Sequence, residues 1–157
     1  ARSHPGRAVS GTHLEDFALG EVIESSESYE MTAERIEQYA TEFDPQPIHV
    51  DPARADDGFF GGIIASGWHT LSATMRLMVR ADLFAGAPVI GVGVDKLRYL
   101  APVRPGDLLS APAEVIDIRP STPPPDRGYL RLRVTTTLSD GTPVITQEWT
   151  VLVPRRT

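Results

Sequence analysis

Residues 66–83 constrain the fold most, because they predict a helix whose apolar residues are spread over more than one side. The large apolar residues in and just before this segment recur at steps of four and three, at Ile64, Trp68, Leu71, Met75 and Met78. Small residues such as alanine, serine and glycine fill many of the positions between them. A helix that is apolar on several sides has to be surrounded by other elements. We therefore expect a buried helix from about Ser66 to Leu83.

The segments after this helix predict the sheet that encloses it. Their β-branched residues and their alternation of apolar and polar side chains indicate four strands, in residues 88–103, 107–120 and 129–153, the last of which folds back at an Asp140-Gly141 turn. Before the helix, residues 21–30 predict one more strand and residues 31–44 a shorter helix. This order favours an α+β fold in which a strongly bent antiparallel sheet wraps around one long buried helix.

Composition narrows the class of protein further. The chain has 157 residues, 41% of them hydrophobic, no cysteine and a formal net charge of −6. An acidic chain lacks the basic face of a nucleic-acid binder, and no apolar run approaches the roughly 18 residues that a membrane span requires. We expect residues 1–14 to form a flexible leader, in which His4 and His13 have no role, and residues 15–157 to form one domain of a cytoplasmic protein.

The segment FDPQPIHVD, residues 43–51, carries the clearest chemical signature. Pro45 ends the preceding helix, because a residue before proline disfavours the α region, so Asp44 lies at the end of that helix. Pro45 and Pro47 stiffen the loop between Asp44 and His49 and lower the entropy cost of holding both side chains together. A carboxylate and an imidazole that converge can bind one water molecule and exchange protons with it.

This loop and the start of the buried helix resemble the MaoC-type dehydratases, the hydratase branch of the hot-dog fold, which includes the (R)-specific enoyl-CoA hydratases. The residues that match the family pattern are Asp44, Pro47, His49, Asp51, Phe60, Gly61, Ala65 and Gly67. The resemblance implies a hydratase that adds water to trans-2-enoyl thioesters, or removes it from 3-hydroxyacyl thioesters. The sequence departs from the pattern at Gln46, where asparagine is usual, at Ser66, where histidine is common, and near Met75, where some members have serine.

Hydration of an enoyl thioester requires a proton acceptor, a proton donor and a site for the negative charge that develops on the thioester oxygen. Asp44 and His49 are the predicted acid–base pair, and the residues alone leave open which is the base. Gly67 is the predicted third catalytic residue, because free backbone amides at a helix start favour negative charge and glycine permits close approach.

The predicted substrate-binding residues surround this pair. They are Pro47, Phe60, Ser66, Trp68, Met75, Arg98 and Arg104. Trp68 and Met75 are candidates to face the acyl chain, and the two arginines, with Lys96 nearby, are candidates to bind the carrier. The carrier is coenzyme A or acyl carrier protein, and either belongs to the substrate, so no separate cofactor is expected. The family resemblance also implies a homodimer, or a larger oligomer built from dimers, in which two sheets pair edge to edge.

Other interpretations of the same residues remain open. Asp44 could initiate a turn, and His49 could be a half-buried structural residue. We expect a structural role for His69 as well. Asp51 most simply caps the next helical turn. A hot-dog acyl-CoA thioesterase and a non-catalytic subunit that binds acyl thioesters are the alternative functions. No metal site is expected, because the histidines and carboxylates lack the spacing of metal ligands.

Overall fold

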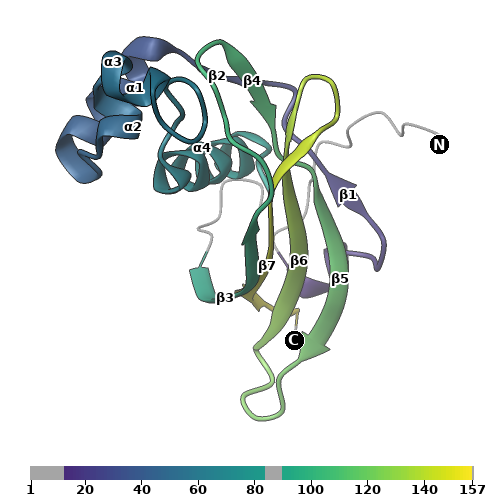
Figure 1. Ribbon diagram of the computed structural model, residues 1–157. Coiled ribbons are helices and arrows are strands. Elements are labelled where there is room, and N and C mark those ends of the chain that lie inside the picture. Colours follow the sequence, from purple (N-terminus) through teal and green to yellow (C-terminus); the bar gives the residue numbers. More distant parts are fainter. Residues whose placement is uncertain (1–12, 84–89, 157) are drawn as a thin grey trace.

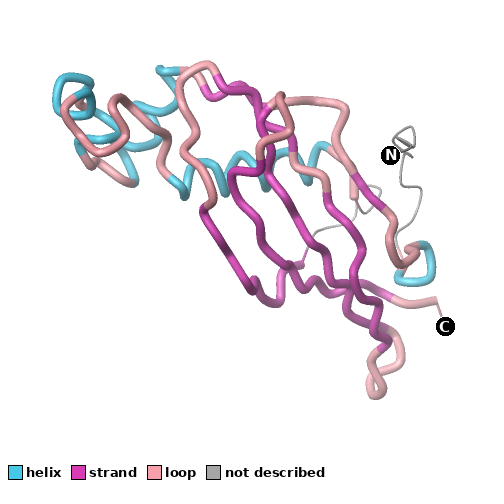
Figure 2. The backbone as a smooth tube through the Cα atoms, turned by 45° about the vertical axis from the view of Figure 1, so that its right-hand side comes forward, coloured by secondary structure: helices cyan, strands magenta, loops and turns pink. Residues whose placement is uncertain are grey.

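The computed structural model of the protein describes residues 13–83 and 90–156. Within these ranges a seven-stranded antiparallel sheet bends around helix α4 (Gly67–Arg80), which crosses one face of the sheet (Figures 1 and 2). The α+β fold predicted from the sequence, a bent sheet around one long helix in the hot-dog arrangement, is therefore confirmed. Helix α4 begins within one residue of the predicted position.

Strand β6 is the centre of the sheet. The seven strands are β1 (Val22–Ile23), β2 (Tyr29–Met31), β3 (Ile90–Tyr99), β4 (Asp107–Ser110), β5 (Ala113–Pro120), β6 (Arg127–Leu138) and β7 (Pro143–Pro154). Strands β5 and β4 pair with successive parts of β6 on one side, and β7 pairs along its whole length on the other. Outside these lie β1 beside β5, β2 beside β4, and β3 beside β7.

Two predicted strands are each divided in the structure. Residues 21–30 form β1 and β2, which pair with different partners, β5 and β4. Residues 107–120 form β4 and β5, because Pro112 has no backbone N–H to continue a ladder between them. Five strands therefore follow the long helix, where the sequence predicted four.

Three short helices lie together beside one end of the sheet (Figure 1). They are α1 (Ala33–Phe43), α2 (Pro47–Val50) and α3 (Pro52–Asp56), and a short 3-10 helix (Leu14–Asp16) precedes β1. Thr32 caps α1 by accepting a hydrogen bond from the Arg35 amide, and Asp51 caps α3 in the same way from Arg54. The predicted rigid loop after Asp44 therefore contains a helical turn, α2, which begins at Pro47.

Helix α4 is buried on one side only. Its inner face, which includes Ala73, Leu77 and Met78, packs into the core of the sheet, and the Thr74 hydroxyl lies 2.6 Å from that of Thr136 on β6. The outer face carries Trp68, Met75 and Val79, whose side chains are 63%, 40% and 56% exposed. The expectation that other elements cover this helix on several sides is therefore wrong for a single chain, whose sheet covers one side of it.

On the N-terminal side, the core extends to one residue before the predicted start of the domain. Leu14, assigned to the leader, is 3% exposed and belongs to the core, so the folded unit starts before residue 15. His4 lies outside the described residues, as does the segment 84–89 that follows the long helix. In the described part of the chain, helices fall short of the length and apolarity needed to cross a membrane.

Candidate active site

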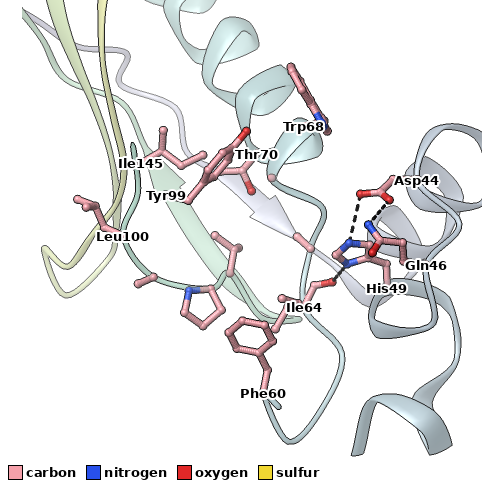
Figure 3. Close-up of a pocket in the computed structure, with 15 residues that line it drawn as sticks. Asp44, Gln46, His49, Phe60, Ile64, Trp68, Thr70, Tyr99, Leu100 and Ile145 are labelled. Carbon is pink, nitrogen blue, oxygen red and sulfur yellow. Dashed lines mark hydrogen bonds and ion pairs between the residues drawn. The ribbon is translucent and has the colours of Figure 1, made fainter. Parts of the chain in front are cut away.

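Asp44 and His49 meet beside the first turn of α4. Asp44 ends α1, and the short helix α2 turns the chain so that His49 comes back toward it. His49 Nε2 lies 3.2 Å from Asp44 Oδ2, and the His49 side chain is 5% exposed (Figure 3). The two residues that the sequence predicted as an acid–base pair are thus in direct contact.

A backbone acceptor fixes the tautomer of His49. Its Nδ1 lies 2.6 Å from the Ile64 carbonyl oxygen. A carbonyl oxygen only accepts hydrogen bonds, so Nδ1 must carry a hydrogen and donate it. Any proton that His49 gains or loses is therefore carried on Nε2, the atom that faces Asp44.

The Asp44 carboxylate is held by donors on both oxygens. Gln46 Nε2 donates to Oδ1 at 2.7 Å, and the Ser66 hydroxyl donates to Oδ2 at 2.7 Å. The hydrogen bond from Gln46, followed by those from Ser66 and the charge of His49, lowers the pKa of Asp44 against an opposing effect of burial. Asp44 is therefore ionised at neutral pH. Both residues that depart from the family pattern beside it, Gln46 and Ser66, bind this carboxylate.

A cavity of about 420 Å³ opens next to this pair, within the size range of small-molecule sites. Asp44, Gln46 and His49 lie at one end, and Tyr99, Leu100 and Ile145 at the other (Figure 3). The rest of its lining is mostly apolar: Phe60, Ile64, Ala65, Gly67, Trp68, Thr70, Ala101, Pro102 and Val103. Burial raises the pKa of the Tyr99 hydroxyl, which keeps the phenol neutral.

Only part of the predicted substrate-binding set lines this cavity. Phe60 and Trp68 do, as does the predicted catalytic residue Gly67. Pro47 instead begins α2, and Met75 projects from the outer face of α4. The Ser66 hydroxyl, predicted to bind substrate, is used by Asp44.

The predicted cations have other partners. Arg104 Nη2 donates to the Phe60 carbonyl oxygen at 2.9 Å and so holds the loop that carries Phe60 into the cavity. Arg98 donates to its own neighbour, the Leu97 carbonyl, and Lys96 lies 3.8 Å from a carboxylate oxygen of Glu148. The lining identified within the described residues contains no lysine or arginine.

The cavity residues that the sequence did not predict come mainly from the end of β3 and the loop that follows it. Tyr99, Leu100 and Val103 belong to the YLAPV stretch, where only the flanking arginines attracted notice. Ile145 lies directly opposite Tyr99 on β7, a pairing that the sequence cannot show because 46 positions of chain separate them. The one usable signal in the sequence was an aromatic residue, Tyr99, at the end of a valine-rich strand.

Gly67 lies at the start of α4, between the acid–base pair and Tyr99. The Ser66 side chain makes no cap hydrogen bond to α4, because it is bonded to Asp44, so the first amides of the helix have no side-chain acceptor from it. A Cβ atom on residue 67 would come within 2.5 Å of the Tyr99 ring. A side chain at this position would therefore displace the Tyr99 ring, so packing favours glycine here in addition to any role of its amide.

In the described part of the chain, the remaining histidines and carboxylates do not assemble into a metal site. Among residues 13–83 and 90–156, no group of three or more histidine, aspartate or glutamate residues is placed to hold a metal ion. His69 is buried away from the cavity lining and bonds to Tyr29, in agreement with the structural role expected from the sequence.

Comparison with known proteins adds evidence that is independent of this geometry. The family model described as "MaoC like domain" matches residues 16–135. The crystal structure of the MaoC-like dehydratase from Rhodospirillum rubrum is 39% identical, covers 94% of this chain and 99% of its own, and superposes with a TM-score of 0.87.

Two curated proteins are similar in sequence as well. The uncharacterized protein YdeM of Bacillus subtilis is 32% identical over 90% of this chain and 99% of its own length. The 3-hydroxyacyl-thioester dehydratase Z of Mycobacterium tuberculosis is 35% identical over 64% of this chain and 68% of its own. Residues 16–135, which the family model matches, include the Asp44–His49 segment and helix α4 of this chain.

Proposed function

The chain belongs to the MaoC-like domain family, which places it among hydratases and dehydratases, and on that premise we propose that it interconverts trans-2-enoyl and 3-hydroxyacyl thioesters. The observation that carries this proposal is the 3.2 Å contact between Asp44 and His49 at the end of a largely apolar cavity. An acid and a base in contact, facing an apolar space, suit the addition of water across a carbon–carbon double bond.

In the hydration direction, Asp44 is the proposed base and His49 the proposed acid. The hydrogen bonds from Gln46 and Ser66 keep Asp44 ionised, and we assign to Nε2 of His49, the ring nitrogen that faces Asp44, the proton that the acid step requires. Asp44 takes a proton from water as its oxygen adds to the β-carbon, and His49 delivers the Nε2 proton to the α-carbon. The proton on Asp44 then passes to Nε2 across their contact, which restores the starting state. Dehydration follows the same steps in reverse.

The start of α4 is the proposed site for the charge on the thioester oxygen. Gly67 lines the cavity, and its amide belongs to the first turn of a 14-residue helix without a side-chain cap. Amides in this position favour negative charge that develops in the transition state. We therefore retain Gly67 as a catalytic residue of the proposed reaction.

The lining favours an uncharged acyl group carried by coenzyme A or acyl carrier protein. Its side chains beyond the acid–base pair are mainly apolar, and the ionised Asp44 would repel a second carboxylate on the substrate. The arginines near the cavity are engaged elsewhere, so the phosphates of a carrier would lie outside the cavity itself.

A homodimer is part of the same proposal. Strand β3 pairs with β7 on one edge, and nearly all its residues are exposed. The exposed apolar side chains of α4, Trp68, Met75 and Val79, need cover as well. A second copy that pairs with β3 would provide a partner for this strand and would also cover the exposed side chains of α4.

Crotonyl-CoA provides the test of the reaction class. We expect the purified protein to decrease the absorbance of the enoyl-thioester band without releasing free thiol. Thiol release without loss of the enoyl band would identify a thioesterase instead. Absence of both, with acyl-CoA still bound, would identify a non-catalytic binding subunit.

A further inference from the structure

Tyr29, Tyr39 and His69 form a cluster of rings between α1 and α4, outside the lining of the cavity. The His69 imidazole stacks on the Tyr39 ring, with centroids 4.6 Å apart and planes inclined by 10°. His69 Nε2 lies 3.0 Å from the Tyr29 hydroxyl, and the side chain is 4% exposed. We refer to these three residues as the ring cluster.

The ring cluster joins the two helix ends that build the proposed active site. Tyr39 also contacts Phe43, the residue before Asp44, at a centroid distance of 5.2 Å. On the other helix, His69 lies two positions after Gly67 and three after Ser66. The stack therefore connects the end of α1, which carries Asp44, with the start of α4, which carries the Ser66 hydroxyl and the Gly67 amide.

Helix α1 buries few of its own residues. It lies beside the sheet and not on its face (Figure 1), and only Ile36 and Ala40 of its 11 residues are buried. The 2.7 Å hydrogen bond from Ser66 to Asp44 nevertheless requires α1 and α4 to be placed to within a few tenths of an ångström. Aromatic stacking with a defined ring orientation can supply this placement, since the Tyr29 hydroxyl also limits rotation of the imidazole.

Burial, more than the nearby charges, favours the neutral form of His69. The Arg35 guanidinium lies 4.5 Å from the centre of the Tyr29 ring and that of Arg76 5.9 Å from it. Burial, followed by the charge of Arg35, lowers the pKa of His69. A neutral imidazole at this position can stack on Tyr39 without adding a third positive charge to the cluster.

We propose that His69 is a positioning residue of this enzyme: its stack on Tyr39 sets α1 against α4 and so holds Asp44 at the start of α4. The kinetic part of this inference rests on the proposed function. The placement of Asp44 does not, because it can be measured without any substrate.

Four variants distinguish the effect of the ring stack from the effect of the other interactions of His69 and Tyr39. His69→Ala and Tyr39→Ala remove it from either side, whereas His69→Phe and Tyr39→Phe retain two stacked rings. For the alanine variants we expect kcat for crotonyl-CoA hydration to fall between about 10- and 100-fold with KM nearly constant, because a misplaced group costs turnover more than binding. For the phenylalanine variants we expect kcat to stay within about threefold of the wild-type value, the range of small local adjustments.

Titration of the Asp44 carboxyl carbon by 13C NMR supplies the second readout, with Asp44→Asn to assign its signal. If α1 shifts, Asp44 loses the Ser66 hydrogen bond, and its pKa rises in both alanine variants but in neither phenylalanine variant. A wild-type protein that fails to hydrate crotonyl-CoA would overturn the proposed function and leave this titration to decide the inference.

The inference fails if the alanine variants, shown to be folded by near-ultraviolet circular dichroism, keep the wild-type titration of Asp44. Tyr39 is only half-buried, so Tyr39→Ala provides this test even where His69→Ala does not fold.

Discussion

The Asp44 carboxylate illustrates how single side chains set the chemistry of this site. Gln46 lies two residues away and could be suspected from the sequence, but Ser66 is 22 residues distant and reaches Asp44 only in the folded chain. The sequence did predict the contact between Asp44 and His49, because two prolines lie in the short segment that joins them and stiffen it. It could not predict which hydrogen bonds would keep Asp44 ionised, since these depend on how α1 meets α4.

His69 gives a prediction about stability at the same scale. Its pKa is lowered in the folded protein, so below the ordinary histidine value of about 6.5 the unfolded chain binds a proton that the folded protein does not. The free energy of unfolding therefore falls as the pH decreases through this window, by at most about 1.4 kcal/mol per pH unit. His69→Phe should lose this component and show a flatter pH dependence.

Urea unfolding of both proteins at several values between pH 7.5 and 5 measures the difference. The remaining histidines are common to wild type and variant, so they cancel in the comparison. Parallel pH dependences for the two proteins would show that His69 is not held neutral by burial.

At the scale of elements, two explanations compete for why glycine occupies position 67 at the start of α4. Its amide is the proposed site for thioester charge, but the packing of Tyr99 alone would also demand glycine, because a Cβ would lie 2.5 Å from the ring. We expect Gly67→Ala to lower turnover in the wild-type background and also in a Tyr99→Ala background, where the methyl group has room. The interaction energy between the two substitutions separates packing from catalysis.

Steady-state kinetics and thermal unfolding of the four proteins in this cycle provide the measurement. If Gly67→Ala becomes harmless once Tyr99 is truncated, the glycine serves packing only, and the proposed role of its amide is wrong.

Elements differed in how well the sequence predicted them, for physical reasons. The helices α1 and α4 were predicted closely, because capping residues, prolines and helical periodicity are local signals. Residues 21–30 were predicted as one strand, since their alternation is weak and the partners that divide them, β4 and β5, lie far along the chain, as in the pairs Tyr29–Leu109 and Val22–Glu114. The exposure of Trp68 and Met75 was missed because periodicity shows where apolar residues fall and not what covers them.

For the whole molecule, the exposed face of α4 and the exposed strand β3 predict a dimer in solution. We expect light scattering after size-exclusion chromatography to give twice the mass of one chain. Val92→Lys on β3 should shift the protein toward the monomer, because a charged residue on an edge strand opposes pairing with another strand. Val22→Lys provides the matched control, since Val22 is equally exposed (57% against 58%) but lies on β1 at a different edge.

A monomeric wild type, or equal dissociation by both lysine variants, would contradict this arrangement. The same feature explains why the sequence overestimated the enclosure of the long helix. The apolar residues of a helix indicate that its surface is covered by other elements. They do not show whether those elements belong to the same chain or to a second copy of it.

Hydration of crotonyl-CoA by wild type, Asp44→Asn and His49→Gln, followed at the enoyl-thioester band, tests the central claim most directly. Each substitution should lower kcat by about 10²–10⁴-fold. The double variant should have a kcat close to that of the less active single variant, because the two residues act as a unit. Asp51→Asn, in the same segment but outside the cavity, should retain activity. Near-wild-type turnover in either Asp44→Asn or His49→Gln would contradict the account.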